Sequence, residues 1–108
     1  MNTTNTDRFI SVVGSYAIAA QDVVAFAGIA RASVADTVGK RGCLYYIASQ
    51  DLAQPNVFHL AEGWASQADL DEHVASATFK AMLEQAFKLH ILKREIYISA
   101  SQGRMLMP

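Results

Sequence analysis

The sequence has little cysteine and no long hydrophobic run, and each shortage excludes a class of protein. Cys43 is the single cysteine, so neither an intrachain disulfide nor a thiolate metal site is expected. No apolar run reaches the roughly 18 residues that span a bilayer as a helix. The start, MNTTNTDRF, lacks the basic stretch and apolar run of a secretory signal. We therefore expect a cytoplasmic protein that binds no membrane.

A surplus of positive charge is also missing. The chain has 9 Lys and Arg against 10 Asp and Glu, a net charge of −1. Because nucleic acids are bound through clustered basic side chains, they are not expected partners. The sequence also lacks a glycine-rich phosphate loop, a G-x-S-x-G elbow and a histidine–carboxylate pair on one face of an element. We therefore expect neither a metal nor a nucleotide cofactor.

Apolar residues, in contrast, are plentiful, at 52% of the 108 residues. A chain of this length fits one domain, and no linker or repeat divides it. The polar start and the last residues are typical of tails, so we predict tails at 1–8 and 102–108 around one domain at 9–101. A domain this short buries only part of its apolar surface, and the surplus predicts a subunit interface.

Hydrophobic periodicity divides the domain into strands and helices. Asp22 is a candidate N-cap of the first helix, and Gly39 a candidate stop signal. Ser66 and Asp69 form an S-x-x-D capping box that opens a short helix ending at His73. The predicted strands are 9–18, 42–50, 57–64 and 91–101, and the predicted helices are 21–38, 66–73 and one that starts at 76.

This order, β-α-β-β-α-β, predicts an α+β protein with a ferredoxin-like fold, in which helices cover one face of an antiparallel sheet. Four strands leave the second face of the sheet bare. Since an apolar face must be covered, we expect a homodimer that packs sheet against sheet.

The segment FHLAEGWASQADLDEHVASATFKAML, residues 58–83, contains the candidate site. Alternate strand residues share a face, so Leu60, Glu62 and Trp64 point one way and His59 the other. A carboxylate on an apolar face must be paired, solvated or shifted in pKa. Glu62 is therefore either a paired group near the end of the sheet or a polar group in a pocket.

Two further residues allow two interpretations each. Trp64 is either core packing at the end of a strand or a pocket wall that stacks on a flat ligand. His73 is either a helix-terminal hydrogen-bonding group or a catalyst. His59, on the opposite face, is a candidate interface residue.

The segment from 42 to 83 resembles the antibiotic biosynthesis monooxygenase family, which includes small quinol monooxygenases. The shared pattern is a tyrosine-rich strand, an acidic turn with proline, an E-x-W-x-S motif, and then a leucine, a histidine, a serine and a phenylalanine. The match extends over roughly residues 9–100. The matching residues here are Gly42, Cys43, Tyr45, Tyr46, Asp51, Pro55, Glu62 to Ser66, Leu70, His73, Ser76 and Phe79.

The resemblance implies a dimeric α+β barrel with a pocket between each sheet and its helices. It also implies that a small phenolic or anthrone-like substrate is oxidised by O₂ with no metal or flavin. Trp64 would stack on the substrate, His73 would be the base or a hydrogen-bond donor, and Glu62 would orient one of them. The substrate-binding residues that it implies are Tyr46, Tyr16, Phe79 and Leu83.

The sequence departs from related branches of the family. Gly14, His73 and Leu83 stand where a haem-degrading branch has its asparagine, tryptophan and haem-ligating histidine, so haem is not expected. Gly63 replaces a bulkier residue, which predicts a locally wider pocket.

Two alternatives to the oxygenase remain: an isomerase or lyase of the same fold, and a non-catalytic module that binds a hydrophobic ligand. A basic ring at the pocket mouth would favour the former, and a pocket filled by Trp64, Phe79 and Met82 would favour the latter.

Overall fold

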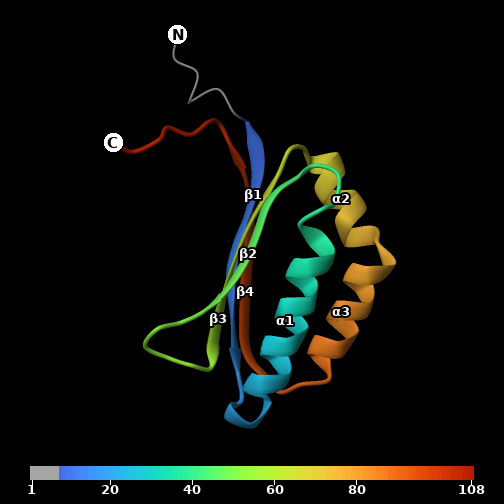
Figure 1. Ribbon diagram of the computed structural model, residues 1–108, viewed down its shortest axis with the longest axis vertical. Coiled ribbons are helices and arrows are strands. Elements are labelled where there is room, and N and C mark those ends of the chain that lie inside the picture. The colour runs from blue at the N-terminus through green and yellow to red at the C-terminus, as the bar shows by residue number, and fades with distance from the viewer. Residues whose placement is uncertain (1–7) are drawn as a thin grey trace.

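The computed structural model describes residues 8–108 and contains one sheet and one layer of helices (Figure 1). The predicted order of elements is confirmed, including two separate helices between the third and fourth strands. Among the described residues, no helix is long and apolar enough to cross a membrane. The elements are β1 (Phe9–Ile18), a 3₁₀ turn η1 (Ala20–Asp22), α1 (Val23–Thr37), β2 (Cys43–Gln50), β3 (Val57–Trp64), α2 (Gln67–Ala75), α3 (Ala77–Phe87) and β4 (Ile91–Ser101).

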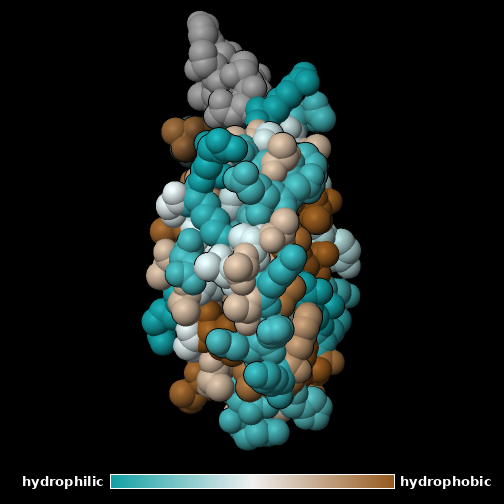
Figure 2. Space-filling view, turned by 90° about the vertical axis from the view of Figure 1, so that its right-hand side faces the viewer, coloured by the Kyte–Doolittle hydropathy of each residue, from teal (hydrophilic) through white to brown (hydrophobic). Residues whose placement is uncertain are grey.

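The strands form one antiparallel sheet in the order β2-β3-β1-β4. The three helices lie on the same side of this sheet (Figure 1). Figure 2 shows this helical side, which is covered largely by hydrophilic side chains with hydrophobic ones between and beside them. The α+β, ferredoxin-like fold predicted from the sequence is therefore confirmed.

The opposite face of the sheet carries an exposed apolar row. Val13 pairs with Ala61 on one side and with Tyr97 on the other, and Ile47 pairs with Ala61. Val13 and Ile47 are each 53% exposed, and Tyr97 is 64% exposed. The helices leave this row uncovered because successive strand residues point to opposite faces. Only the residues that alternate with this row face the helices.

The core lies between the sheet and the helices in two clusters. One cluster contains Tyr16, Ile18, Phe26, Phe58 and Ala86. The other contains Val12, Tyr46, Trp64 and Leu70. The strand residues in these clusters all have even residue numbers. This is expected because alternate residues of a strand point to the same face, here the face that the helices cover.

Two serines set the ends of α2 and α3. The hydroxyl of Ser66 accepts from the Asp69 N–H at 3.1 Å and donates to the Asp69 carboxylate at 2.9 Å, so the predicted cap is confirmed. Ser76 ends α2 and accepts from the Phe79 N–H at 3.3 Å at the start of α3. The chain turns at Ser76, which leaves His73 in the last turn of α2.

Two predicted helix signals act differently from the sequence-based expectation. Asp22 precedes α1, but its side chain does not cap that helix; it accepts from the His90 N–H at 2.8 Å. After α1, the glycine with a positive φ is Gly42, at 81°, and not Gly39. A side chain at Gly42 would also collide with the side chain of Asp69. Gly39 directly follows the C-cap Val38 of α1, so its position fits the predicted stop, but the conformation that requires glycine lies at Gly42 in the turn into β2.

Replacing Ser66 by alanine should destabilise the protein by about 1 kcal/mol, because the first turn of α2 loses its cap. Urea unfolding of Ser66→Ala and of Glu84→Ala, an exposed change within α3, measures the difference. Equal unfolding midpoints for the two variants would show that the cap contributes nothing.

Candidate functional site

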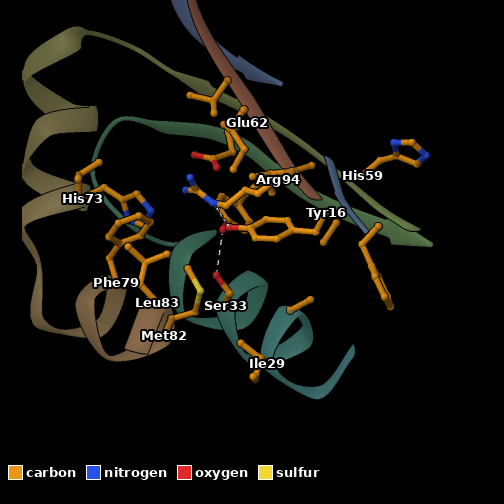
Figure 3. A pocket seen from close by; sticks show the side chains of 18 of the residues that line it. Tyr16, Ile29, Ser33, His59, Glu62, His73, Phe79, Met82, Leu83 and Arg94 are labelled. Carbon is orange, nitrogen blue, oxygen red and sulfur yellow. Dashed lines mark hydrogen bonds between the residues drawn. The ribbon is translucent and has the colours of Figure 1, made fainter. Parts of the chain in front are cut away.

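A cavity of about 410 Å³ lies between the sheet and the helices (Figure 3). The sheet contributes the polar side chains of Tyr16, Tyr46, Glu62 and Arg94 to its wall. Most of the remaining wall is apolar. The helices contribute, among others, Ile29, Ser33, Leu70, His73, Phe79, Met82 and Leu83.

Glu62 is a buried carboxyl on the inward face of β3. It is 4% exposed, and the indole Nε1–H of Trp64 donates to its Oε1 at 2.8 Å. Burial raises the pKa of Glu62, and the hydrogen bond from Trp64 partly opposes this rise. A carboxyl with a raised pKa in an apolar cavity is a suitable acceptor for a proton from a weakly acidic ligand.

Trp64 is fully buried and is not part of the cavity wall. Its ring stacks on the imidazole of His73, with centroids 4.7 Å apart and planes 24° apart. The expectation that Trp64 stacks on the substrate is therefore wrong for this geometry, because His73 covers the indole. Trp64 instead holds two wall residues, Glu62 by a hydrogen bond and His73 by stacking.

His73 is 3% exposed and is surrounded by aromatic rings. Besides Trp64, Phe79 meets it edge-on at 4.8 Å and Tyr46 at 6.1 Å. Burial, together with the nearby ammonium group of Lys40, lowers the pKa of His73 to about 4. His73 is thus neutral at neutral pH. Its Nε2 atom is buried and has no hydrogen-bond partner among the described residues.

The two tyrosines predicted to bind substrate both line the cavity. The hydroxyl of Tyr46 lies 2.9 Å from Ser33 Oγ. Burial raises the pKa of Tyr46 to about 12, so its phenol remains protonated. The hydroxyl of Tyr16 accepts from Arg94 Nε at 3.0 Å, and the guanidinium group lies 5.5 Å from the Tyr16 ring centre.

Phe79 and Leu83, which the resemblance implies as substrate-binding residues, also line the cavity. Figure 3 shows both side chains on the helical side, near His73. Gly63 does not widen the cavity, and that expectation is wrong. A side chain at Gly63 would collide with the ring of Tyr45, which belongs to the opposite face of the sheet.

His59 borders the cavity, but in Figure 3 its imidazole points away from the other labelled side chains, and its Nε2 lies 2.8 Å from Asp51 Oδ1. The strand alternation correctly placed it on the face opposite Glu62. Within residues 8–108, no group of three or more His, Cys, Asp or Glu side chains could hold a metal ion.

Lys40 and Arg94 are not among the site residues that the sequence predicts. Arg94 alternates with Ile96 and Ile98 along β4, and this period of two would have placed it on the inward face. Lys40 lies between α1 and β2, and its Nζ donates to His73 Nδ1 at 3.0 Å. No periodicity marks a residue in such a connection, so the sequence offers no comparable signal for Lys40.

The α+β domain thus has a buried carboxyl and a neutral imidazole on the wall of one apolar cavity. The family model described as antibiotic biosynthesis monooxygenase matches residues 9–85. The chain belongs to this family. No match was found among curated proteins.

Solved structures with the same fold come from distant relatives. A proposed antibiotic biosynthesis monooxygenase from Deinococcus radiodurans is 19% identical, with a TM-score of 0.86 over 92% of this chain and 98% of that one. A conserved protein from Methanosarcina mazei is 24% identical, with a TM-score of 0.80 over 87% and 93% of the two chains. A second proposed family member, from Nitrosomonas europaea, is 15% identical, with a TM-score of 0.79 over 97% and 96%. At these identities the likeness shows the fold.

The buried imidazole should make stability depend on pH. The pKa of His73 is lowered from 6.5 in the unfolded chain to about 4 in the folded one. The stability contributed by neutral His73 is therefore present above about pH 6.5 and is lost as the pH falls toward 4, by up to about 3 kcal/mol. Glu62, whose pKa is raised, takes up its proton earlier in the folded state and offsets part of this loss.

A comparison of variants isolates the contribution of His73. Urea unfolding measures the free energy of unfolding of wild type and His73→Gln between pH 7 and 4. The two values should converge as the pH falls, because only wild type loses the stability that neutral His73 contributes. His90→Gln, at an exposed position, reports the effect of removing a surface histidine. Parallel curves for wild type and His73→Gln would contradict the buried neutral imidazole.

Proposed function

We propose that the protein is a cofactor-independent monooxygenase that oxidises a quinol, anthrone or related phenolic compound with O₂. The observation that carries this proposal is the pairing of a carboxyl of raised pKa, Glu62, with the unpartnered Nε2 of His73 on the wall of one apolar cavity. Family membership over residues 9–85 supports the same class of reaction.

The proposed reaction needs no electrons beyond those of the substrate. Glu62 accepts the hydroxyl proton of a phenol, or a ring proton of an anthrone, and the resulting anion reduces O₂. One oxygen atom forms a bond to the substrate carbon, and the other leaves as water. An anthrone CH₂ thereby becomes C=O, and a quinol becomes a hydroxyquinone, so that atoms and electrons balance in both cases.

His73 is suited to stabilise the anion. A neutral imidazole can donate one hydrogen bond from Nε2 to a developing oxyanion, and in a water-poor cavity such a bond is strong. Arg94, on the same wall, adds positive charge that favours an anion. The apolar lining excludes water and so protects the reactive anion from reprotonation.

Two features favour the oxygenase over the alternatives. Phe79 and Met82 line the cavity and do not fill it, whereas a filled pocket is the feature that would favour a non-catalytic module that binds a hydrophobic ligand. Arg94 is the one cationic side chain in the described lining, whereas an isomerase or lyase of phosphorylated compounds would be expected to need several.

Oxygen uptake in metal-free buffer, with a panel of hydroquinones and anthrones, tests the proposal. Wild type should exceed the autoxidation background, and Glu62→Gln should lose about 10²- to 10⁴-fold of the enzymatic rate, since an amide cannot accept the proton. Glu84→Gln, an exposed change in α3, should behave as wild type. Uptake at background across the panel would refute the oxygenase for these substrates. Equal rates in wild type and Glu62→Gln would remove Glu62 as the base.

The working protein is proposed to be a homodimer that covers the apolar row of Val13, Ile47 and Tyr97. An exposed apolar row on a sheet is typical of a subunit interface. Light scattering should give twice the chain mass for wild type, and Val13→Lys should shift the population toward monomer. Val24→Lys, which changes an exposed valine of α1, should remain dimeric. A monomeric wild type at micromolar concentration would contradict this prediction.

A further inference from the structure

The ammonium group of Lys40 forms three hydrogen bonds, one of them with the imidazole of His73. Its Nζ lies 3.0 Å from His73 Nδ1, 3.0 Å from Ser76 Oγ and 3.1 Å from Thr78 Oγ1. An ammonium group has three protons, and each of these atoms takes one. The half-buried lysine is therefore held at the edge of α2 and α3 by three acceptors.

The direction of each bond in this network follows from the donors. Ser76 Oγ donates its own proton to the His73 carbonyl oxygen at 2.6 Å, so it can only accept from Lys40. A protonated lysine cannot accept at all. His73 Nδ1 must therefore be the acceptor and carry no proton. The proton of the neutral imidazole then resides on Nε2.

The Nε2–H group is left as an unpaired donor. Nε2 is buried and has no partner among residues 8–108, although His73 lines the cavity. Figure 3 shows the imidazole reaching from α2 toward the cavity above Phe79. Because a buried donor without a partner is costly, it marks a place where a ligand acceptor completes the hydrogen bonding.

We propose that Lys40 is a positioning residue that locks His73 in the neutral Nε2–H tautomer, so that His73 donates a hydrogen bond to an oxygen of the substrate and does not take its proton. The role in catalysis rests on the proposed function, whereas the tautomer does not. The lock resolves the choice between base and donor that the sequence left open for His73, and it leaves proton acceptance to Glu62.

The charged and titratable groups around His73 agree with this division of roles. Lys40 opposes a second proton on the ring because two positive charges would be adjacent. Glu62 from β3 and Tyr46 from β2 line the same cavity as His73, and Asp36 from α1 lines a neighbouring hollow that His73 also borders. None of these four groups forms a hydrogen bond with Nε2, which has no partner among residues 8–108.

Nitrogen NMR of protein labelled at histidine tests the lock directly. At pH 7, wild type should show His73 with an unprotonated Nδ1 and a protonated Nε2. Lys40→Glu places an acceptor beside Nδ1, so the proton should move to Nδ1 or both nitrogens should be protonated. Lys80→Glu makes the same charge change at an exposed position of α3 and should leave the wild-type pattern. A wild-type spectrum with Nδ1 protonated would overturn the proposal by itself.

A second variant keeps the test decisive if Lys40→Glu does not fold. Lys40→Met removes the ammonium charge with little change of length, and the titration midpoint of His73 should move upward from that of wild type. An unchanged midpoint and an unchanged tautomer in every Lys40 variant would overturn the lock.

Kinetics separate the lock from the proposed function. For a substrate that is turned over, Lys40→Glu should lower kcat by about 10²-fold or more, as the loss of one oxyanion donor does, with a smaller effect on KM. If no substrate reacts while the NMR pattern is as expected, the proposed function fails and the lock stands. If substrate reacts while wild-type Nδ1 carries the proton, the lock fails and the function stands.

Discussion

The imidazole of His73 is buried in its neutral form against an ammonium group, and the rest of the site is arranged around that constraint. Stacking on Trp64 and the edge of Phe79 exclude water from the ring. Without water, a proton on the ring would be unsolvated and beside a positive charge, so the pKa falls to about 4. The same burial would strengthen each hydrogen bond that the cavity makes with the proposed substrate.

Separate parts of the chain meet at this ring. The alternation of β3 brings Glu62 and Trp64 to one face, and the Trp64 indole fixes the carboxyl through a 2.8 Å hydrogen bond. The caps at Ser66 and Ser76 set the length of α2, and so the position of His73. Lys40 reaches back from the connection before β2. The proposed base and the proposed donor are therefore held by different elements around one indole.

The parts of this arrangement that follow from local periodicity could be predicted from the sequence. The order of elements, the inward direction of Glu62, the outward direction of His59 and the cap at Ser66 each follow from spacing along one strand or helix. The contacts of Trp64 and His73 could not be predicted, because they depend on how α2 crosses the sheet. Trp64 points inward, as alternation requires, but α2 places His73 over it. The partner of His73 is likewise fixed only when the connection containing Lys40 packs beside α2, 33 positions away in the sequence.

The measurement that tests the central claim most directly is the absorption spectrum of an anthrone bound to the protein in the absence of oxygen. The spectrum reports whether the bound anthrone is ionised. The account predicts that wild type at pH 7 converts bound anthrone to its anion, and that Glu62→Gln binds the compound but leaves it neutral. Bound anthrone that stays neutral in wild type, or that ionises equally in Glu62→Gln, would contradict a cavity that ionises its ligand through Glu62.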